Sequence, residues 1–77
     1  MVDLIFTAHA LERMRARQIP ETAVYYVVED ADEVLDRDDE CAEYTGVWET
    51  RRFMVVACGD REPYRVRTVI ETRGRGR

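Results

Sequence analysis

The run Phe53–Cys58 (FMVVAC) is apolar at every position, without the alternation of a strand that has one wet face. Such a run is typical of a central strand covered on both faces, by the protein itself or by a partner. The turn-forming segment Gly59–Pro63 (GDREP) follows it. A chain of 77 residues can build only one hydrophobic core. The other elements are therefore expected to cover this strand.

Strand patterns fill most of the chain after residue 32. We expect strands at Glu33–Arg37, Cys41–Trp48, Arg52–Cys58 and Tyr64–Thr72. A two-residue loop at 49–50 would set the register of the second and third strands and pair Tyr44 with Val55 and Cys41 with Cys58. Glu-Thr is not a favoured sequence for such a loop, so the structure has to test this register.

The chain before residue 30 has helical periodicity. Leu4–Phe6 is strand-like, and Thr7 is expected to cap a helix from Ala8 to Gln18, because its hydroxyl can accept from a free backbone N–H. The expected buried face of this helix comprises Ala10, Leu11, Met14 and Gln18. Ile19 and Pro20 end this helix, and a second helix is expected from about Pro20 to Glu29. That helix is expected to bury Ala23, Val24, Val27 and Val28.

The predicted fold is therefore α+β, with two N-terminal helices packed on one face of a roughly four-stranded, mostly antiparallel sheet. One domain spans residues 1–72, and RGRGR at 73–77 is expected to be a flexible basic tail. The N-terminus lacks the basic start of a signal peptide. No apolar run approaches the roughly 18 residues needed to span a membrane. We therefore expect a cytoplasmic protein with no membrane partner.

Metal and disulfide chemistry is not expected. Cys41, Cys58 and His9 are too few for a structural zinc site, which needs four ligands. The acidic stretch 36–40 (DRDDE) lacks the glycine and distal glutamate of an EF-hand loop. We expect no metal, no cofactor and two reduced thiols, which are most simply small strand residues. A redox role is the alternative.

Charge is unevenly distributed along the chain. All twelve basic residues are arginine, which reflects either a G+C-rich genome or the bidentate fit of guanidinium to phosphate. The net charge of -4 divides into +1 for residues 1–20, -10 for 21–49 and +5 for 50–77. This division predicts a basic surface that could meet RNA, and an acidic one that could meet a basic partner or a second copy. A solvated acidic loop region is the alternative for the middle segment.

The first predicted helix carries a ridge of three titratable or cationic side chains. His9, Arg13 and Arg17 fall on one arc of about 80°, separate from the buried face. The free N–H groups and the dipole at the start of the helix favour a bound anion there. The same field favours the neutral form of His9, which is the form that a general base requires. The alternatives are a surface or capping histidine and a solvated face, with the arginines paired to Glu12, Asp3 and Glu21.

Metal-free RNA cleavage requires a base for the ribose 2'-hydroxyl, an acid for the leaving oxygen and cations for the phosphate. His9 can titrate near neutrality, and arginine matches two phosphate oxygens. Arg65 and Arg67 are expected on one face of their strand, with Val66, Thr68 and Ile70 on the other. Tyr44 or Tyr64 could stack on a base or donate a proton. Alternatively, Arg65 and Arg67 pair across strands with Glu43.

The opening F-T-x-H-A-x-x-R-M-x-x-R-x-I-P, with R-x-x-V-V from Arg52 and V-x-T-V from Val66, resembles a bacterial family of small domains of unknown function. That family is similar in layout to the RelE and BrnT ribonuclease toxins of toxin-antitoxin pairs. The resemblance implies a metal-independent endoribonuclease with an antitoxin partner. Its catalytic positions would be His9, Arg13 and Arg67. From the residues themselves, the candidate substrate-binding positions are Arg17, Arg65, Tyr64 and Tyr44.

Two other functions remain open from the sequence. One is a non-catalytic module that binds a protein partner or forms a homodimer through the central strand and the acidic segment 29–43. The other is RNA binding without cleavage, which would weaken steeply with added salt.

Overall fold

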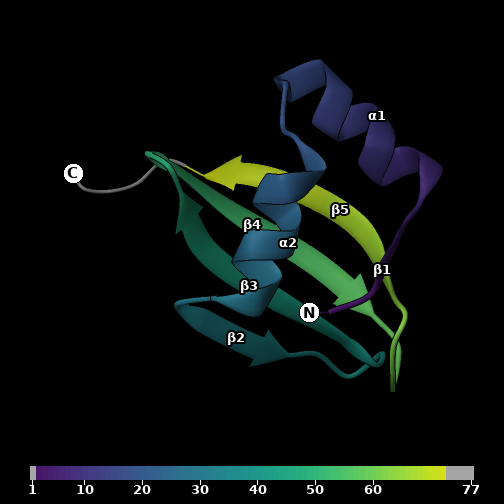
Figure 1. The fold of residues 1–77 in the computed structure, drawn as a ribbon. Helices are drawn as coiled ribbons and strands as arrows, with labels where there is room; N and C mark the ends of the chain where they lie inside the picture. Colours follow the sequence, from purple (N-terminus) through teal and green to yellow (C-terminus); the bar gives the residue numbers. More distant parts are fainter. Residues whose placement is uncertain (1, 73–77) are drawn as a thin grey trace.

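The computed structural model describes residues 2–72, which form two helices and one five-stranded sheet (Figure 1). The elements are β1 (Leu4–Phe6), α1 (Ala8–Arg17), α2 (Glu21–Glu29), β2 (Glu33–Asp36), β3 (Cys41–Trp48), β4 (Arg51–Cys58) and β5 (Tyr64–Thr72). The strand order is β1-β5-β4-β3-β2. The α+β class is thus confirmed. The predicted tail at 73–77 lies outside the described residues.

The sheet has one strand more than the four predicted, because β1 pairs with β5. This pairing is parallel, with Leu4 opposite Tyr64 and Phe6 opposite Val66. All other neighbouring strands are antiparallel. A three-residue strand is too short to show the alternation of apolar and polar residues that identifies a strand. Its partner also lies about sixty positions later in the chain. The sequence therefore identified the segment as strand-like without revealing its partner.

Helix α1 begins at Thr7, as predicted. The Thr7 hydroxyl accepts from the Ala10 amide at 3.2 Å and donates to the Val66 carbonyl of β5 at 2.8 Å. The helix ends one residue early, because Gln18 adopts a left-handed backbone with φ 56°. Gln18 therefore leaves the predicted buried face and is exposed. Leu11 is also 36% exposed, so that face reduces to Ala10 and Met14.

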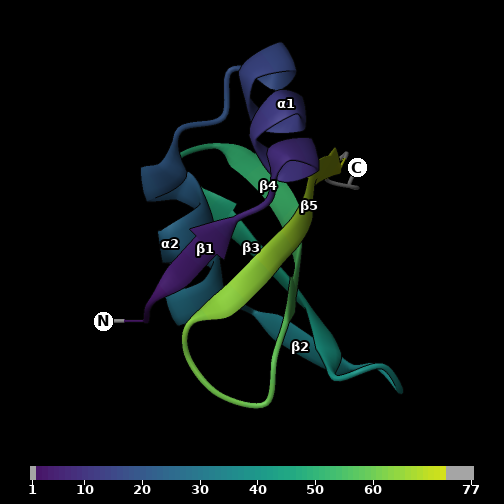
Figure 2. The same cartoon turned by 90° about the vertical axis from the view of Figure 1, so that its right-hand side faces the viewer.

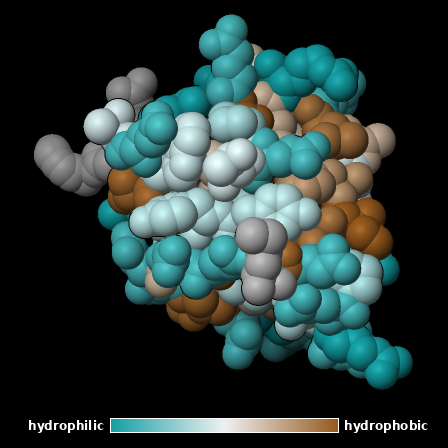
Figure 3. All heavy atoms as spheres, viewed as in Figure 1, coloured by the Kyte–Doolittle hydropathy of each residue, from teal (hydrophilic) through white to brown (hydrophobic). Residues whose placement is uncertain are grey.

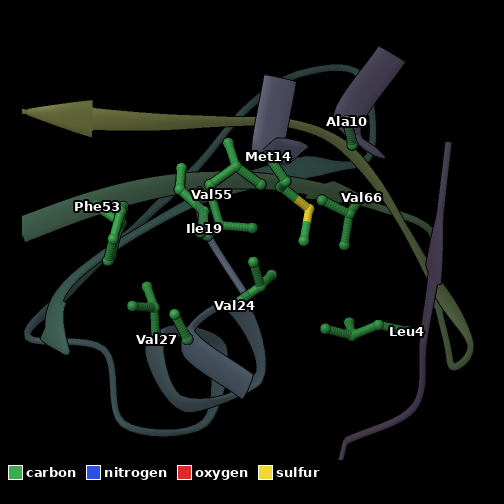
Figure 4. Packing of buried hydrophobic residues seen from close by; sticks show 11 residues of the cluster. Leu4, Ala10, Met14, Ile19, Val24, Val27, Phe53, Val55 and Val66 are labelled. Atoms are coloured by element: carbon green, nitrogen blue, oxygen red, sulfur yellow. The ribbon is translucent and has the colours of Figure 1, made fainter. Parts of the chain in front are cut away.

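The core lies between the helices and one face of the sheet (Figures 2 and 4). Helix α1 packs along β5, and α2 packs over β3 and β4. From α2 the predicted residues Ala23, Val24 and Val27 are buried, and Val28 is partly buried. They meet side chains of β1, β4 and β5: Leu4, Phe53, Val55, Val66 and Val69. In Figure 3, hydrophilic residues cover most of this side, and hydrophobic ones gather on the right, where Figure 1 places β1.

The predicted hairpin between β3 and β4 is confirmed. Tyr44 lies opposite Val55 and Cys41 opposite Cys58, with Glu49 and Thr50 as the loop. Glu49 has φ 57°, so it supplies the positive φ that a tight hairpin loop needs. Strand β4 is central in the sheet, which agrees with its continuous apolar run.

A bulge between β4 and β5 changes which side chains share a face. Ala57 pairs with Val66, but Val56 pairs with Thr68, so one extra residue of β5 lies between these pairs. Arg67 and Thr68 consequently both lie on the face away from the helices, while Val66 and Val69 lie in the core. The prediction that Val66, Thr68 and Ile70 share one face is therefore wrong.

The two cysteines are joined by a disulfide bond, and the expectation of reduced thiols is wrong. The hairpin register sets Cys41 directly across from Cys58, so the two side chains project from the same face of neighbouring strands. The predicted hairpin already paired Cys41 with Cys58. Reduced thiols were expected all the same, because disulfides are rare in cytoplasmic proteins.

Removing the disulfide should destabilise the domain. The bond closes a loop with a sequence separation of 17, which corresponds to about 3 kcal/mol in the chain-entropy description. The variant carrying Cys41→Ala and Cys58→Ala should lose about this much free energy of unfolding in urea titrations. Two thiols titrating in unreduced, denatured wild-type protein would contradict the bond itself.

The two described glycines that lie in tight surroundings should respond differently to alanine. Gly59 has φ +132°, a conformation that side-chain-bearing residues rarely adopt, so Gly59→Ala should cost about 1–3 kcal/mol. Gly46 has ordinary backbone, and an added methyl would meet its nearest neighbours at 3.6 Å. Gly46→Ala should therefore leave the free energy of unfolding unchanged or raise it by about 0.4–1 kcal/mol. Equal losses in urea titrations would contradict this difference.

Candidate functional site

The sheet face away from α2 is closed by long side chains, since neither described helix packs on it. Cys41, Val56 and Cys58 form a second small cluster there, each no more than 5% exposed. Arg67 of β5 crosses β4 to reach β3, where its Nη1 lies 3.9 Å from Cys41 Sγ. The aliphatic part of such a side chain covers apolar surface while the guanidinium stays in water.

A pocket of about 490 Å³ opens on this face where α1 begins. Its lining residues are Thr7, His9, Arg37, Val56, Arg67 and Thr68. Two structural features bring His9 to Arg67. The Thr7 hydroxyl fixes the start of α1 to the Val66 carbonyl, and the bulge turns Arg67 and Thr68 to the same side. The pocket thus joins the N-terminus of α1, the middle of β5 and the turn after β2.

The arginines of this pocket are only weakly paired. Arg67 Nη1 lies 3.8 Å from Asp39 Oδ2, and Arg37 lies 3.8 Å from Asp39 and 3.5 Å from Glu43. Glu43 therefore pairs with Arg37, and not with Arg65 or Arg67 as the sequence suggested. All these side chains are substantially exposed, and such pairs contribute about 0–1 kcal/mol. An incoming phosphate can replace the carboxylates at little cost.

The remaining predicted site residues lie elsewhere. Arg13 is exposed on α1 and does not line this pocket, and Arg17 lines a different one of about 610 Å³ beside Arg51 and Arg52. Neither forms an ion pair within residues 2–72, so their pairing with Glu12, Asp3 or Glu21 is not seen. Arg65 lies opposite Cys58 on the open sheet face, outside the pocket.

Both tyrosines lie away from His9. Tyr44 and Tyr64 line a third pocket with Asp36 and Asp60, and Tyr44 points to the helical side, opposite Val55. Burial, followed by the proximity of Tyr64 and Asp36, raises the pKa of Tyr44 above its usual value. Its phenol is therefore a proton donor at neutral pH and cannot act as a base.

Arg51, which sequence reasoning did not select, is the most extensively bonded arginine of the described part. It donates two hydrogen bonds to Glu71, at 3.0 and 2.9 Å, and others to the carbonyls of Gln18 and Arg17 at the end of α1. Its guanidinium also lies 5.0 Å from the centre of the Phe53 ring. Arg51 therefore joins α1, β4 and β5, and its donors are not free for a ligand. No sequence signal indicated this contact, because Glu71 lies opposite Phe53 in a register that the bulge between β4 and β5 shifts by one residue.

A family model described as a domain of unknown function (DUF4258) matches residues 6–72. The chain belongs to the DUF4258 family. This confirms the predicted membership of a small family of unknown function. The matched span contains every residue that lines the His9 pocket. Searches of curated proteins and of solved structures each found no match.

The DUF4258 domain shows no group of three or more His, Cys, Asp or Glu side chains placed to hold a metal ion within residues 2–72. No described helix is long and apolar enough to cross a membrane. The side chains that line the His9 pocket offer one imidazole, two guanidinium groups and two hydroxyls.

The Arg51–Glu71 pair of the DUF4258 domain should make stability depend on pH in the acid range. Its hydrogen bonds lower the pKa of Glu71 from the usual 4.5. The stabilisation is thus complete above about pH 4.5 and lost as pH falls through the lowered pKa. Glu71→Gln should have a lower Tm at pH 7, with a difference from wild type that shrinks below pH 4.5. A difference that stays constant from pH 7 to pH 3 would contradict this.

Proposed function

We propose that this domain is a metal-independent endoribonuclease that cleaves RNA by attack of a ribose 2'-hydroxyl on the adjacent phosphate. One observation carries the proposal: His9, Arg37 and Arg67 line a single pocket, and its arginines have only weak, exposed carboxylate partners. A titratable imidazole beside two exchangeable guanidinium groups suits phosphodiester chemistry.

In the proposed mechanism, His9 takes the proton of the 2'-hydroxyl as the 2'-oxygen forms a bond to phosphorus. The bond from phosphorus to the 5'-oxygen breaks, and the products are a 2',3'-cyclic phosphate and a 5'-hydroxyl. His9 is the one imidazole among the lining side chains, so the leaving oxygen receives its proton from water or from the protonated His9. Arg67 and Arg37 neutralise the charge that grows on the phosphate oxygens.

The structure-based proposal differs from the sequence-based one in its supporting residues. Arg37 takes the role first assigned to Arg13, since it lines the pocket with Arg67. We propose that Arg13, Arg17 and Arg65, all exposed, hold neighbouring phosphates of the RNA. Tyr44 and Tyr64 have no part in the chemistry, because they line a separate pocket.

The test is cleavage of labelled single-stranded RNA in EDTA by the purified wild-type protein and three variants. His9→Ala should lower the rate about 10²–10⁴-fold, the usual contribution of a general base. Arg67→Gln should lower it about 10²–10³-fold, by loss of charge stabilisation. Arg61→Gln is the matched control, because Arg61 is an exposed arginine of the β4–β5 turn that lines none of the pockets described above.

Two results would reject the proposal. One is the absence of cleavage at high protein concentration, and the other is equal cleavage by wild type and His9→Ala. Binding of RNA without cleavage, lost in Arg67→Gln and weakened by salt, would instead support the non-catalytic RNA-binding alternative.

We also propose that the enzyme is toxin-like and held inactive by an antitoxin protein. The acidic segment between α2 and β3 supports a protein partner, because its charge would repel RNA. Growth arrest on expression of wild type, relieved by His9→Ala or by the product of an adjacent gene, is the expected outcome. Unimpaired growth would contradict toxicity.

A further inference from the structure

Strand β2 forms an edge of the sheet that no other described element covers. All four of its residues are exposed. Val34 and Leu35 project from opposite faces, and their exposed fractions are 50% and 52%. β2 is short and carries Glu33 and Asp36 at its ends, as edge strands usually do, but it also offers apolar surface on both faces. Such an edge suits a second strand laid beside it.

The backbone of β2 has hydrogen-bonding groups directed outward. The Arg37 amide donates to the Cys41 carbonyl at 2.8 Å, so the backbone groups of Arg37 point toward β3. This bond shows which residues of β2 bond to β3 and which point away from it. Groups of an antiparallel ladder alternate, so Glu33 and Leu35 face β3 and Val34 and Asp36 face away. The amides and carbonyls of Val34 and Asp36 are therefore free to bond to an added strand.

The acidic residues around β2 favour a positively charged strand as its partner. Residues 29–40 contain eight acidic side chains and one basic side chain, Arg37. Among the described residues, only Asp32 and Asp39 of this set form ion pairs, with Arg52 and with Arg37 and Arg67. A second copy of the chain would bring two such acidic segments together. An extended segment rich in lysine or arginine would instead neutralise the excess charge.

We propose that the β2 edge binds a basic, extended segment of another protein, which adds as a strand beside Val34 and Asp36. Backbone bonds supply the affinity. Because side chains pair with those directly opposite, Val34 and Leu35 select two adjacent apolar residues, and Glu33 and Asp36 select a basic residue on either side of them. The proposal concerns a surface outside the His9 pocket and does not require RNA cleavage. It extends the antitoxin idea by stating where and how a partner chain would bind.

The probe is an acetylated six-residue peptide of two valines flanked on each side by two arginines, titrated into the intact protein. Calorimetry gives the affinity, and amide chemical shifts give the location. Shifts should concentrate at residues 33–36. Two control peptides are matched to the probe: one carries N-methyl groups on alternate amides, which removes the ladder donors, and the other has glutamate for arginine. Each should bind at least tenfold more weakly.

Val34→Pro provides the matched change in the protein. The Val34 amide points away from β3 and makes no bond to it. Proline at this position should therefore keep the fold and remove only the donor that an added strand would use. Val34→Thr keeps the amide and β propensity. The proline variant should bind the probe peptide at least tenfold more weakly than wild type, and the threonine variant should lose much less affinity. Circular dichroism shows whether each variant keeps the fold. Should the proline variant unfold, the N-methyl peptide decides. Equal binding of the N-methyl peptide, shifts confined to the arginines of the open face, or no binding would overturn the proposal.

Discussion

The unequal covering of strand β4 is the constraint on which the rest of the structure depends. One face of this apolar strand lies in the core under α2, and on the other face Val56 lies beside Arg67, Arg37 and the Cys41–Cys58 bond. Small domains bury little surface, so side chains on the second face must also shield the core. The same arginines that shield Val56 line the candidate pocket. Stability and ligand binding therefore share these residues.

Thr7 connects the helical layer to this second face. Its side chain caps α1 and bonds to β5, so the first turn of the helix is held beside the bulge. His9 lies in that turn, whereas Arg13 and Arg17 lie about 6 and 12 Å farther along the axis. His9, Arg13 and Arg17 do lie along one side of α1, as predicted from the sequence, but only His9 lines the pocket. Arg17 instead lies near Arg51, at the opposite end of α1.

Local features were predictable from the sequence, and features that depend on distant pairing were not. The Thr7 cap, the 49–50 loop and the bounds of β3 and β5 follow from short-range patterns. The parallel pairing of β1 and the bulge at Val56 and Ala57 depend on strands far apart in the chain. For the site, the lone histidine, the strand period and the family resemblance selected His9 and Arg67, but also Arg13, which does not line the pocket. Arg37 was missed because it reaches the pocket only through the fold of the β2–β3 turn.

The account centres on His9 and Arg67 binding one phosphate together. A titration with a ribonucleoside 2',3'-cyclic phosphate, followed by NMR signals of the His9 ring and the arginine Nε groups, tests this most directly. We predict that His9, Arg67 and Arg37 shift together with a single Kd and that Arg13 stays in place. Shifts of His9 and Arg67 with different Kd values, or shifts at Arg13 and Arg17 alone, would contradict a shared site.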